Sequence, residues 1–273
     1  TSTGSQATTL KGYNTATNSL RFSPDGTRLL LGGYDGTVEV WDAKSGTKMF
    51  AYPSQKESVM SAAFSPDGKR IATAEWHITS EGSHLEAGMG SHNAEIWDAH
   101  TRQHLLTLKG HTQDITSLAF SSDSKYLVTG GYDSTVILWD AANGKRLRTF
   151  SGHTAALFAV AFSPDGSKIV SGGDDQKIAV WSVSTGRRIA TLLGHTGRIS
   201  SIAFSPNGRR ILSGSYDNTA TIWSANTFKE LLPLEGHTGM VTSVAWSSDG
   251  KRVVTRSSDK TVKVWSTDFE VGT

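Results

Sequence analysis

Apolar and polar side chains alternate along three short segments within residues 110–140, and the same pattern recurs along most of the chain. Alternation with a period of two predicts half-buried β-strands. Turn sequences separate the segments: Ser-Pro-Asp-Gly stands at 23–26, 65–68 and 163–166, and Ser-Pro-Asn-Gly at 205–208. Glycine supplies the positive φ that such hairpin turns require. A second turn and a fourth segment, such as 145–150, follow, so each unit is predicted to be a four-stranded antiparallel meander.

Tryptophans give the period of this repeat. Five of them are spaced by 42 residues, and the first precedes the second by 56, which is 42 plus 14. An aromatic residue precedes the motif tryptophan by 19 positions in five units, but Phe64 precedes Trp97 by 33. A 14-residue insertion is therefore predicted in the second unit, within residues 74–93. The units end at Trp41, Trp97, Trp139, Trp181, Trp223 and Trp265.

Two dipeptides in these units carry a resemblance to a known family. Gly-His pairs stand at 110/111, 152/153, 194/195 and 236/237, and Trp-Asp pairs at 41/42, 97/98 and 139/140. With a period of 42 residues, the chain resembles the WD-repeat family over essentially its whole length. The resemblance implies an all-β fold, a β-propeller of four-stranded blades around a central channel. The regular units are also similar to WD-repeat arrays of bacterial multidomain proteins.

The length indicates how many blades the chain forms. Six units of 42 residues and the 14-residue insertion leave 7 of the 273 residues. Residues 2–13 align without gaps on residues 184–195, so we expect an N-terminal outer strand near Gln6 to Leu10. We predict a single domain over 1–273, a six-bladed propeller in which this strand completes the last blade and closes the ring. Seven blades would require a missing repeat and are the alternative.

A Ser-His-Asp trio raises the question of hydrolase activity. His153, Ser171, Asp175 and Trp181 recur at the same spacing in four units, whereas an enzyme needs one site. In the family that the chain resembles, such residues form a hydrogen-bonded network inside each blade. We therefore expect structural networks and no catalytic residue, with the other copies at His111, Thr129, Asp133 and Trp139, at His195, Ser213, Asp217 and Trp223, and at His237, Thr255, Asp259 and Trp265.

The first two units depart from this pattern. Unit 1 has Tyr13 and Leu31 where the histidine and the hydroxyl are expected, which suggests an apolar substitute pair. Unit 2 keeps Thr73 but has Gln55 and Ser91 in place of the histidine and the aspartate.

The insertion collects residues that could bind a metal ion. His77, His84 and His92 lie in or beside it, together with several glutamates, and imidazole with carboxylate suits zinc or nickel. Their spacings of 7 and 8 lack the short pairing that preorganises ligands. We expect no metal and no cofactor, and we keep as the alternative a propeller enzyme or metal site built from this insertion at the channel mouth. A surface loop that widens the binding face is the simpler interpretation.

Propellers of the resembled family most often bind proteins on the face that carries the Gly-His loops. Tyrosines recur there just before the turn aspartate, and tyrosine is enriched at binding hot spots. Large side chains also stand where some inner strands begin. We predict a mixed apolar and polar patch that consists of Tyr34, Met60, Trp76, Tyr132, Phe158, Arg198 and Tyr216.

Composition and charge narrow the partner classes. The formal charge is +2, and paired basic residues such as Lys69-Arg70 and Arg209-Arg210 share their hairpins with aspartates, so nucleic acid is not an expected partner. Cysteine is absent, which excludes disulfides and thiolate zinc sites, and no apolar run is long enough for a membrane helix. We expect a cytoplasmic monomer. Position 1 is Thr, so a removed signal segment and an excised domain both stay open.

These patterns together favour a non-catalytic scaffold. The predicted face offers an apolar patch with a polar rim, which is typical of protein interfaces. The expected partner is a protein, a peptide or another domain of a longer parent chain.

Overall fold

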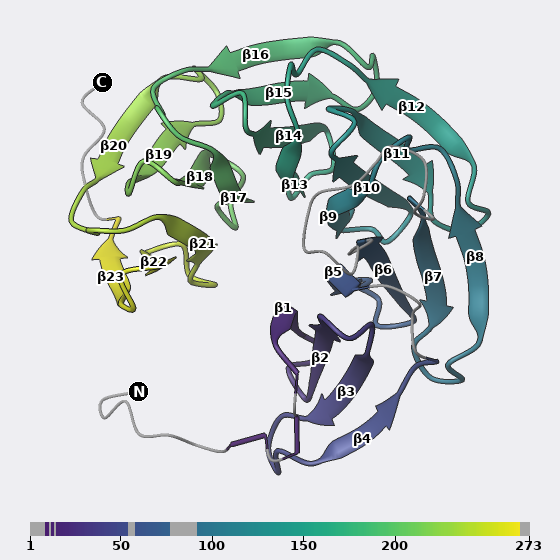
Figure 1. Cartoon of the computed structure of the whole chain (residues 1–273). Helices are drawn as coiled ribbons and strands as arrows, with labels where there is room; N and C mark the ends of the chain where they lie inside the picture. Colours follow the sequence, from purple (N-terminus) through teal and green to yellow (C-terminus); the bar gives the residue numbers. More distant parts are fainter. Residues whose placement is uncertain (1–8, 11, 14, 54–57, 77–91, 268–273) are drawn as a thin grey trace, which may run out of the picture.

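The computed structural model describes residues 9–10, 12–13, 15–53, 58–76 and 92–267. Within these ranges the chain folds into six antiparallel sheets, each made of strands that are consecutive in sequence, arranged around a central axis (Figure 1). The fold is a six-bladed β-propeller, and the predicted meander is confirmed. We number the blades in chain order.

The strands of the first three blades have the following bounds. Blade 1 consists of β1 (Thr17–Phe22), β2 (Arg28–Gly33), β3 (Val38–Asp42) and β4 (Lys48–Ala51). Blade 2 consists of β5 (Ser58–Phe64), β6 (Arg70–Trp76), β7 (Ala94–Asp98) and β8 (His104–Leu108). Blade 3 consists of β9 (Ile115–Phe120), β10 (Tyr126–Gly131), β11 (Val136–Asp140) and β12 (Arg146–Phe150).

The remaining blades continue the same order. Blade 4 consists of β13 (Leu157–Phe162), β14 (Lys168–Gly173), β15 (Ile178–Ser182) and β16 (Arg188–Leu192). Blade 5 consists of β17 (Ile199–Phe204), β18 (Arg210–Ser215), β19 (Ala220–Ser224) and β20 (Glu230–Leu234). Blade 6 has three described strands, β21 (Val241–Trp246), β22 (Arg252–Ser257) and β23 (Val262–Ser266).

The apolar core lies between neighbouring blades. In one cluster, Val128 and Leu138 of blade 3 pack with Leu157 and Trp181 of blade 4, and all four are buried. Similar clusters join blades 1 and 2, 2 and 3, 4 and 5, and 5 and 6. Each blade is therefore stabilised mainly by burying apolar surface against its neighbours.

The turn between the first and second strands of a blade is held by its own side chains. Ser163 Oγ donates to Asp165 Oδ1 over 2.5 Å and accepts from the backbone N of Lys168 over 2.9 Å. Hydrogen bonds to the carboxylate, the one from Ser163 first, lower the pKa of Asp165 to about 2. Gly166 has a φ of 69°, the left-handed conformation that the sequence predicts for this position.

The predicted closing strand, Gln6 to Leu10, lies outside the described residues except for Thr9 and Leu10, which belong to no strand. Leu10 and Tyr13 pack against Leu31 and Trp41 on blade 1. In Figure 1 the described blades form an arc that is open between β21–β23 and β1. Whether the N-terminal strand pairs with β23 stays a prediction. Within the described ranges, no helix has the length and apolar character needed to span a bilayer.

Candidate functional site

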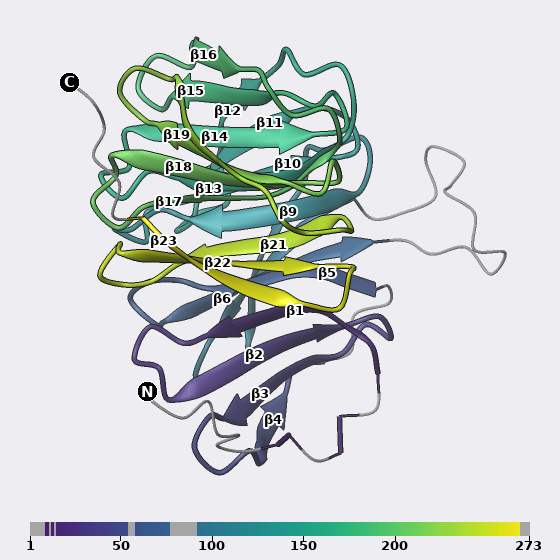
Figure 2. The same cartoon turned by 90° about the vertical axis from the view of Figure 1, so that its left-hand side faces the viewer.

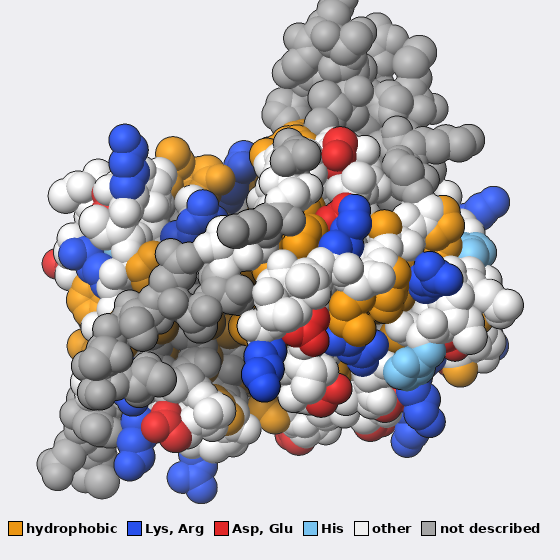
Figure 3. Space-filling view, turned by 90° about the horizontal axis from the view of Figure 1, so that it is seen from below, with side chains coloured by type: hydrophobic (Ala, Val, Ile, Leu, Met, Phe, Trp, Pro, Cys, Tyr) orange, Lys and Arg blue, Asp and Glu red, His pale blue; other side chains and the backbone are white. Residues whose placement is uncertain are grey.

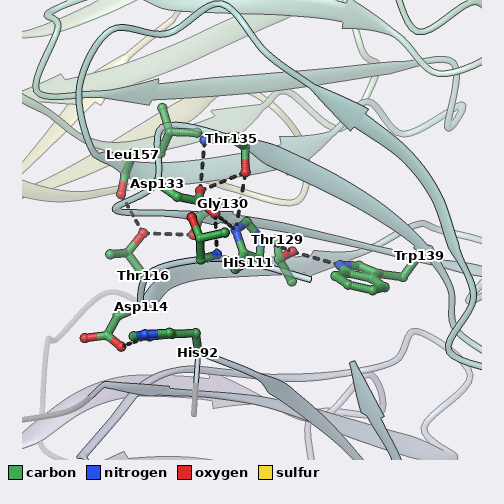
Figure 4. Close-up of polar contacts among 11 residues, drawn as sticks. His92, His111, Asp114, Thr116, Thr129, Gly130, Asp133, Thr135, Trp139 and Leu157 are labelled. Atoms are coloured by element: carbon green, nitrogen blue, oxygen red, sulfur yellow. Dashed lines mark hydrogen bonds and ion pairs between the residues drawn. The ribbon is translucent and has the colours of Figure 1, made fainter. Parts of the chain in front are cut away.

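Four blades contain the same buried hydrogen-bonded chain. In blade 4 the indole Nε1 of Trp181 donates to Ser171 Oγ over 2.8 Å, and this oxygen lies 2.8 Å from His153 Nε2. The other ring nitrogen, Nδ1, lies 2.8 Å from Asp175 Oδ2. Figure 4 shows the copy in blade 3, with Trp139, Thr129, His111 and Asp133. Blades 5 and 6 contain equivalent chains through Ser213 and Thr255.

This geometry places a serine, a histidine and an aspartate in the order of a hydrolase triad, but it leaves no room for a substrate. Ser171 is fully buried, and its oxygen already accepts the indole proton. The hydroxyl proton then points to His153 Nε2, and Nδ1–H points to Asp175. Each hydroxyl is thus a structural link between a strand tryptophan and a loop histidine.

The network keeps its carboxylates ionised and its imidazole neutral. Burial alone would raise the pKa of Asp133, but the hydrogen bonds from His111 and from the backbone N of Thr112 lower it. Burial lowers the pKa of His153 despite the neighbouring Asp175. Charging the imidazole therefore works against the folded state.

Blade 1 replaces the chain in a way that the sequence only partly predicts. Tyr13 and Leu31 both pack on Trp41, with the Tyr13 and Trp41 ring centroids 6.4 Å apart. The indole Nε1 instead donates to Glu39 Oε2 over 2.9 Å, and Glu39 also pairs with Lys48. Our sequence reasoning missed Glu39, which stands two positions before the motif tryptophan and could have been found as a carboxylate within a buried strand.

In blade 2 the shortened chain survives at one bond. Trp97 Nε1 donates to Thr73 Oγ1 over 3.1 Å. The two residues that replace the histidine and the aspartate, Gln55 and Ser91, lie outside the described residues.

Backbone hydrogen bonds fix the predicted tyrosines at the channel mouth. The N–H of Tyr132 donates to the carbonyl of Asp114, and that of Tyr216 to the carbonyl of Arg198, each over 2.9 Å. The same bond joins Asp174 to Ala156 in blade 4. A Cβ at Gly173 would collide with the carbonyl oxygen of Ala156, so only glycine allows this close approach. The turn before each third strand is thereby anchored to the loop before the inner strand.

Three blades bring aromatic and charged side chains together into one group. The guanidinium carbon of Arg198 lies 3.8 Å from the Phe158 ring centroid and 5.0 Å from that of Tyr216. The Tyr132 ring meets Phe158 edge-on at 5.4 Å. Arg198 Nε and Nη2 donate to the two carboxylate oxygens of Asp174 over 2.5 and 3.2 Å. We call these five residues the Arg198 cluster.

The other predicted patch residues lie on blades 1 and 2. Tyr34, which is 45% exposed, contacts Trp76 with ring centroids 6.4 Å apart. Tyr34 and Met60 line the central channel, a space of about 1520 Å³, together with Phe158, Arg198 and Tyr216. The structure thus divides the seven predicted residues between the Arg198 cluster and a Tyr34–Trp76 pair, with Met60 on the channel wall.

Asp174 is the member of the Arg198 cluster that we did not predict. It occupies the position held by tyrosine in blades 1, 3 and 5, and the sequence signal was this exception itself. A carboxylate there can pair with the arginine of the following blade, which is the only blade with arginine at that loop position.

Of the three candidate metal ligands, only His92 lies within the described residues, and His77 and His84 lie outside them. His92 Nδ1 is 2.7 Å from Oδ1 of the buried Asp114 in blade 3 (Figure 4). No group of three or more His, Cys, Asp or Glu side chains able to hold a metal ion occurs among the described residues. His92 therefore joins the end of the insertion to blade 3.

The arginines on the opposite face are partly engaged within the fold. Arg70 Nη1 and Nη2 donate to the carbonyls of Ala141 and Ser124 in blade 3 over 2.5 and 2.6 Å. Arg210 Nη1 donates to the carbonyl of Thr267 over 3.0 Å. On the side of the molecule seen in Figure 3, described Lys and Arg side chains are interspersed with Asp and Glu. Several basic residues thus bracket blades and do not form a continuous anion-binding surface.

Comparison with known proteins places these features in context. A family model described as "WD domain, G-beta repeat" matches residues 4–42, 46–83, 102–140, 144–182, 186–224 and 228–266. A chain from the solved structure "Crystal Structure of Mitotic Checkpoint Complex" superposes with a TM-score of 0.82 at 26% identity, over 94% of this chain and 76% of that chain.

Two curated relatives are similar over part of the chain. "U3 small nucleolar RNA-interacting protein 2" from Homo sapiens is 30% identical over 111 residues, 41% of this chain and 23% of that protein. "Target of rapamycin complex subunit wat1" from Schizosaccharomyces pombe is 30% identical over 114 residues, 41% of this chain and 32% of that protein. The matches span less than a third of either relative.

Proposed function

The chain belongs to the WD domain, G-beta repeat family, and on this premise we propose that it is a non-catalytic scaffold that binds a protein or peptide segment through the Arg198 cluster. The observation that carries the proposal is the position of Arg198, held between Phe158 and Tyr216 by the carboxylate of Asp174. Propellers of this family are typically interaction scaffolds. The names of two compared proteins also refer to complexes.

The Arg198 cluster combines features of a binding hot spot. Phe158 and Tyr132 offer aromatic area at low entropic cost, and Arg198 is preorganised by stacking and by its ion pair. The bonds to Asp174 use Nε and Nη2, which leaves Nη1 for an acceptor on the partner. The expected ligand places an apolar side chain against the aromatic rings and an oxygen acceptor beside Arg198.

The fold supports a rigid presentation of this cluster. Its members come from blades 3, 4 and 5, which contain complete His–Asp networks, and each turn is anchored through its backbone N–H. Little conformational entropy is lost when a partner binds such a face.

A random peptide library displayed on phage provides the probe. We expect selected peptides to bind the full chain, and to lose at least about tenfold in affinity when Phe158→Ala and Arg198→Ala are combined. The matched control is Arg209→Ala with Lys251→Ala, two exposed basic residues in turns of the opposite face. Unchanged affinity in the cluster variant, or a loss confined to the control, would contradict the proposal. Circular dichroism and thermal melting establish that each variant is folded.

A further inference from the structure

One sheet face of blade 6 exposes apolar side chains that are buried in the other blades. Val254, Val262 and Val264 are 36%, 63% and 61% exposed. Their equivalents 42 residues earlier are fully buried against blade 6, and the equivalents in blade 4 are likewise covered by blade 5. The blade 5 residues are Leu212, Ala220 and Ile222. An exposed apolar face that repeats a buried one indicates a missing neighbour.

The side of blade 1 that faces the opening is exposed in the same way. Leu20 and Phe22 on β1 are 51% and 64% exposed, whereas their equivalents on β13, Val160 and Phe162, are 6% and 9% exposed. Figure 2 looks into the opening and shows β21–β23 above β1 and β2. Both sides of the opening thus present surfaces that the other blades bury.

Blade 6 also keeps the polar groups that join one blade to the next. In blade 5, Ser200 Oγ donates to the carbonyl of Val241, and Ser201 Oγ accepts from the backbone N of Val244. The equivalent residues of blade 6 are Thr242 and Ser243, whose hydroxyls are at the same register of the inner strand. Ser243 is exposed. A strand placed like β21, one blade further on, would meet both hydroxyls.

A fourth strand added to blade 6 would not cover this face. Such a strand extends the sheet at the edge of β23, whereas Val254, Val262 and Val264 point out of the plane of the sheet. Only a second sheet, packed about 10 Å away, removes these side chains from water.

We propose that the opening between blade 6 and blade 1 is the docking site of one further repeat unit of the same kind, carried on the same polypeptide as the six described blades. The proposed unit is a four-stranded antiparallel sheet whose inner strand packs on Val254, Val262 and Val264. Its opposite face covers Leu20 and Phe22. Every described blade boundary joins consecutive repeats of one polypeptide, which supplies a high effective concentration for docking.

One position predicts how this unit differs from the others. In blades 4 and 5 the residues Gly172 and Gly214 leave room for an isoleucine or valine of the next blade, with 2.7 Å between a hypothetical Cβ and that side chain. Blade 6 has Arg256 at this position, and it is exposed. The docked unit therefore carries a small or acidic side chain there in place of the branched aliphatic one, because a valine would clash with the guanidinium stem.

The test extends the full chain by one repeat. A copy of residues 184–225 placed directly after Thr267, in place of 268–273, continues the 42-residue period without a gap. The extended chain should melt at least about 5 °C higher than the original and bind markedly less of an apolar fluorescent dye. Because the copied inner strand carries isoleucines, Arg256→Gly should increase this gain in the extended chain and leave the melting temperature of the original chain nearly unchanged.

A pair of matched variants reads out the face itself. In the original chain, Val264→Asp should be tolerated within about 2 °C, whereas Val180→Asp, at the equivalent and fully buried position of blade 4, should be strongly destabilising. In the extended chain, Val264→Asp should abolish the gain in melting temperature.

Three results would overturn the proposal. One is an extended chain that gains no stability, whether Arg256 is kept or the Arg256→Gly substitution is made. Another is equal destabilisation by Val264→Asp and Val180→Asp in the original chain, which would mean that blade 1 already covers the face. The third is a concentration-dependent dimer in sedimentation that Val264→Asp dissociates, since a second copy would then be the occupant.

Discussion

The guanidinium carbon of Arg198 lies 3.8 Å from the centroid of the Phe158 ring, across the boundary between blades 4 and 5. Stacking of this kind is typical of arginine, whose planar group can remain hydrogen-bonded while it covers an aromatic face. Here the hydrogen bonds go to Asp174, whose side chain, like that of Arg198, is about one third exposed. The contact holds a charged group at the channel mouth in a single orientation.

Asp174→Asn should weaken peptide binding without unfolding the protein. The ion pair is partly exposed, so its loss should cost no more than about 1 kcal/mol of stability. Affinity for a selected peptide should fall about fivefold, because Arg198 is no longer preorganised. Calorimetric titration and thermal melting measure the two quantities. The control is Asp123→Asn, which removes an exposed pair with Lys125, and a similar loss in both variants would count against a role for Asp174.

Ser171→Ala should destabilise the fold by about 1 to 3 kcal/mol. The substitution leaves the Trp181 indole and the His153 imidazole without their buried partner. Urea unfolding followed by tryptophan fluorescence measures the change. Ser182→Ala serves as the control, because Ser182 is partly exposed and its hydroxyl contacts only surface groups of its own turn. Equal effects of the two substitutions would refute a network role for Ser171.

Stability should decrease as pH falls below 6.5. Burial lowers the pKa of His153 from 6.5, so the unfolded chain binds a proton at a higher pH than the folded chain does. The His153 contribution is complete above 6.5 and is lost as pH falls toward the lower folded value. Chemical unfolding at about pH 7.5 and about pH 5.5 should show the decrease, and His153→Gln should reduce its slope. An imidazole resonance of His153 that titrates above 6.5 would contradict this prediction.

Acidification below pH 3.8 should cause a further loss of stability. The pKa values of Asp133 and Asp165 are lowered in the folded protein, so their contribution is present above 3.8 and disappears as the carboxylates are protonated. Thermal melting between about pH 4.5 and about pH 2.5 measures it. Asp165→Asn should flatten this part of the curve, and an unchanged curve would show that the turn carboxylate does not contribute.

Gln176→Gly should stabilise the protein by about 0.5 to 1 kcal/mol. Gln176 has a φ of 64°, a conformation that costs a residue with a Cβ about this much, and blade 1 has Gly36 at the equivalent position with a φ of 78°. Urea unfolding measures the gain. Gln176→Ala is the control and should give none, so an equal response to glycine and alanine would refute the conformational explanation.

Much of the fold could be predicted because each repeat encodes its own sheet. The alternation of side chains, the Ser-Pro-Asp-Gly turns and the 42-residue period are local signals, and they predicted the six antiparallel blades. The Ser171 network has a fixed spacing within one repeat, so its members could be named in advance as a repeated set. The unpredicted partner of Trp41, Glu39, follows from the same locality, since strand residues two apart lie on one face.

The candidate site could be predicted only in part because its contacts cross blade boundaries. The sequence alone indicated which turn and inner-strand positions lie on one face of the propeller, and it thereby named Tyr132, Phe158, Arg198 and Tyr216. The tertiary structure decided that Arg198 stacks on Phe158 and pairs with Asp174, and that blades 6 and 1 expose faces that other blades bury. The physical reason is that a repeat fixes backbone hydrogen bonds within its own sheet, whereas side-chain contacts between sheets depend on how the blades are packed around the axis.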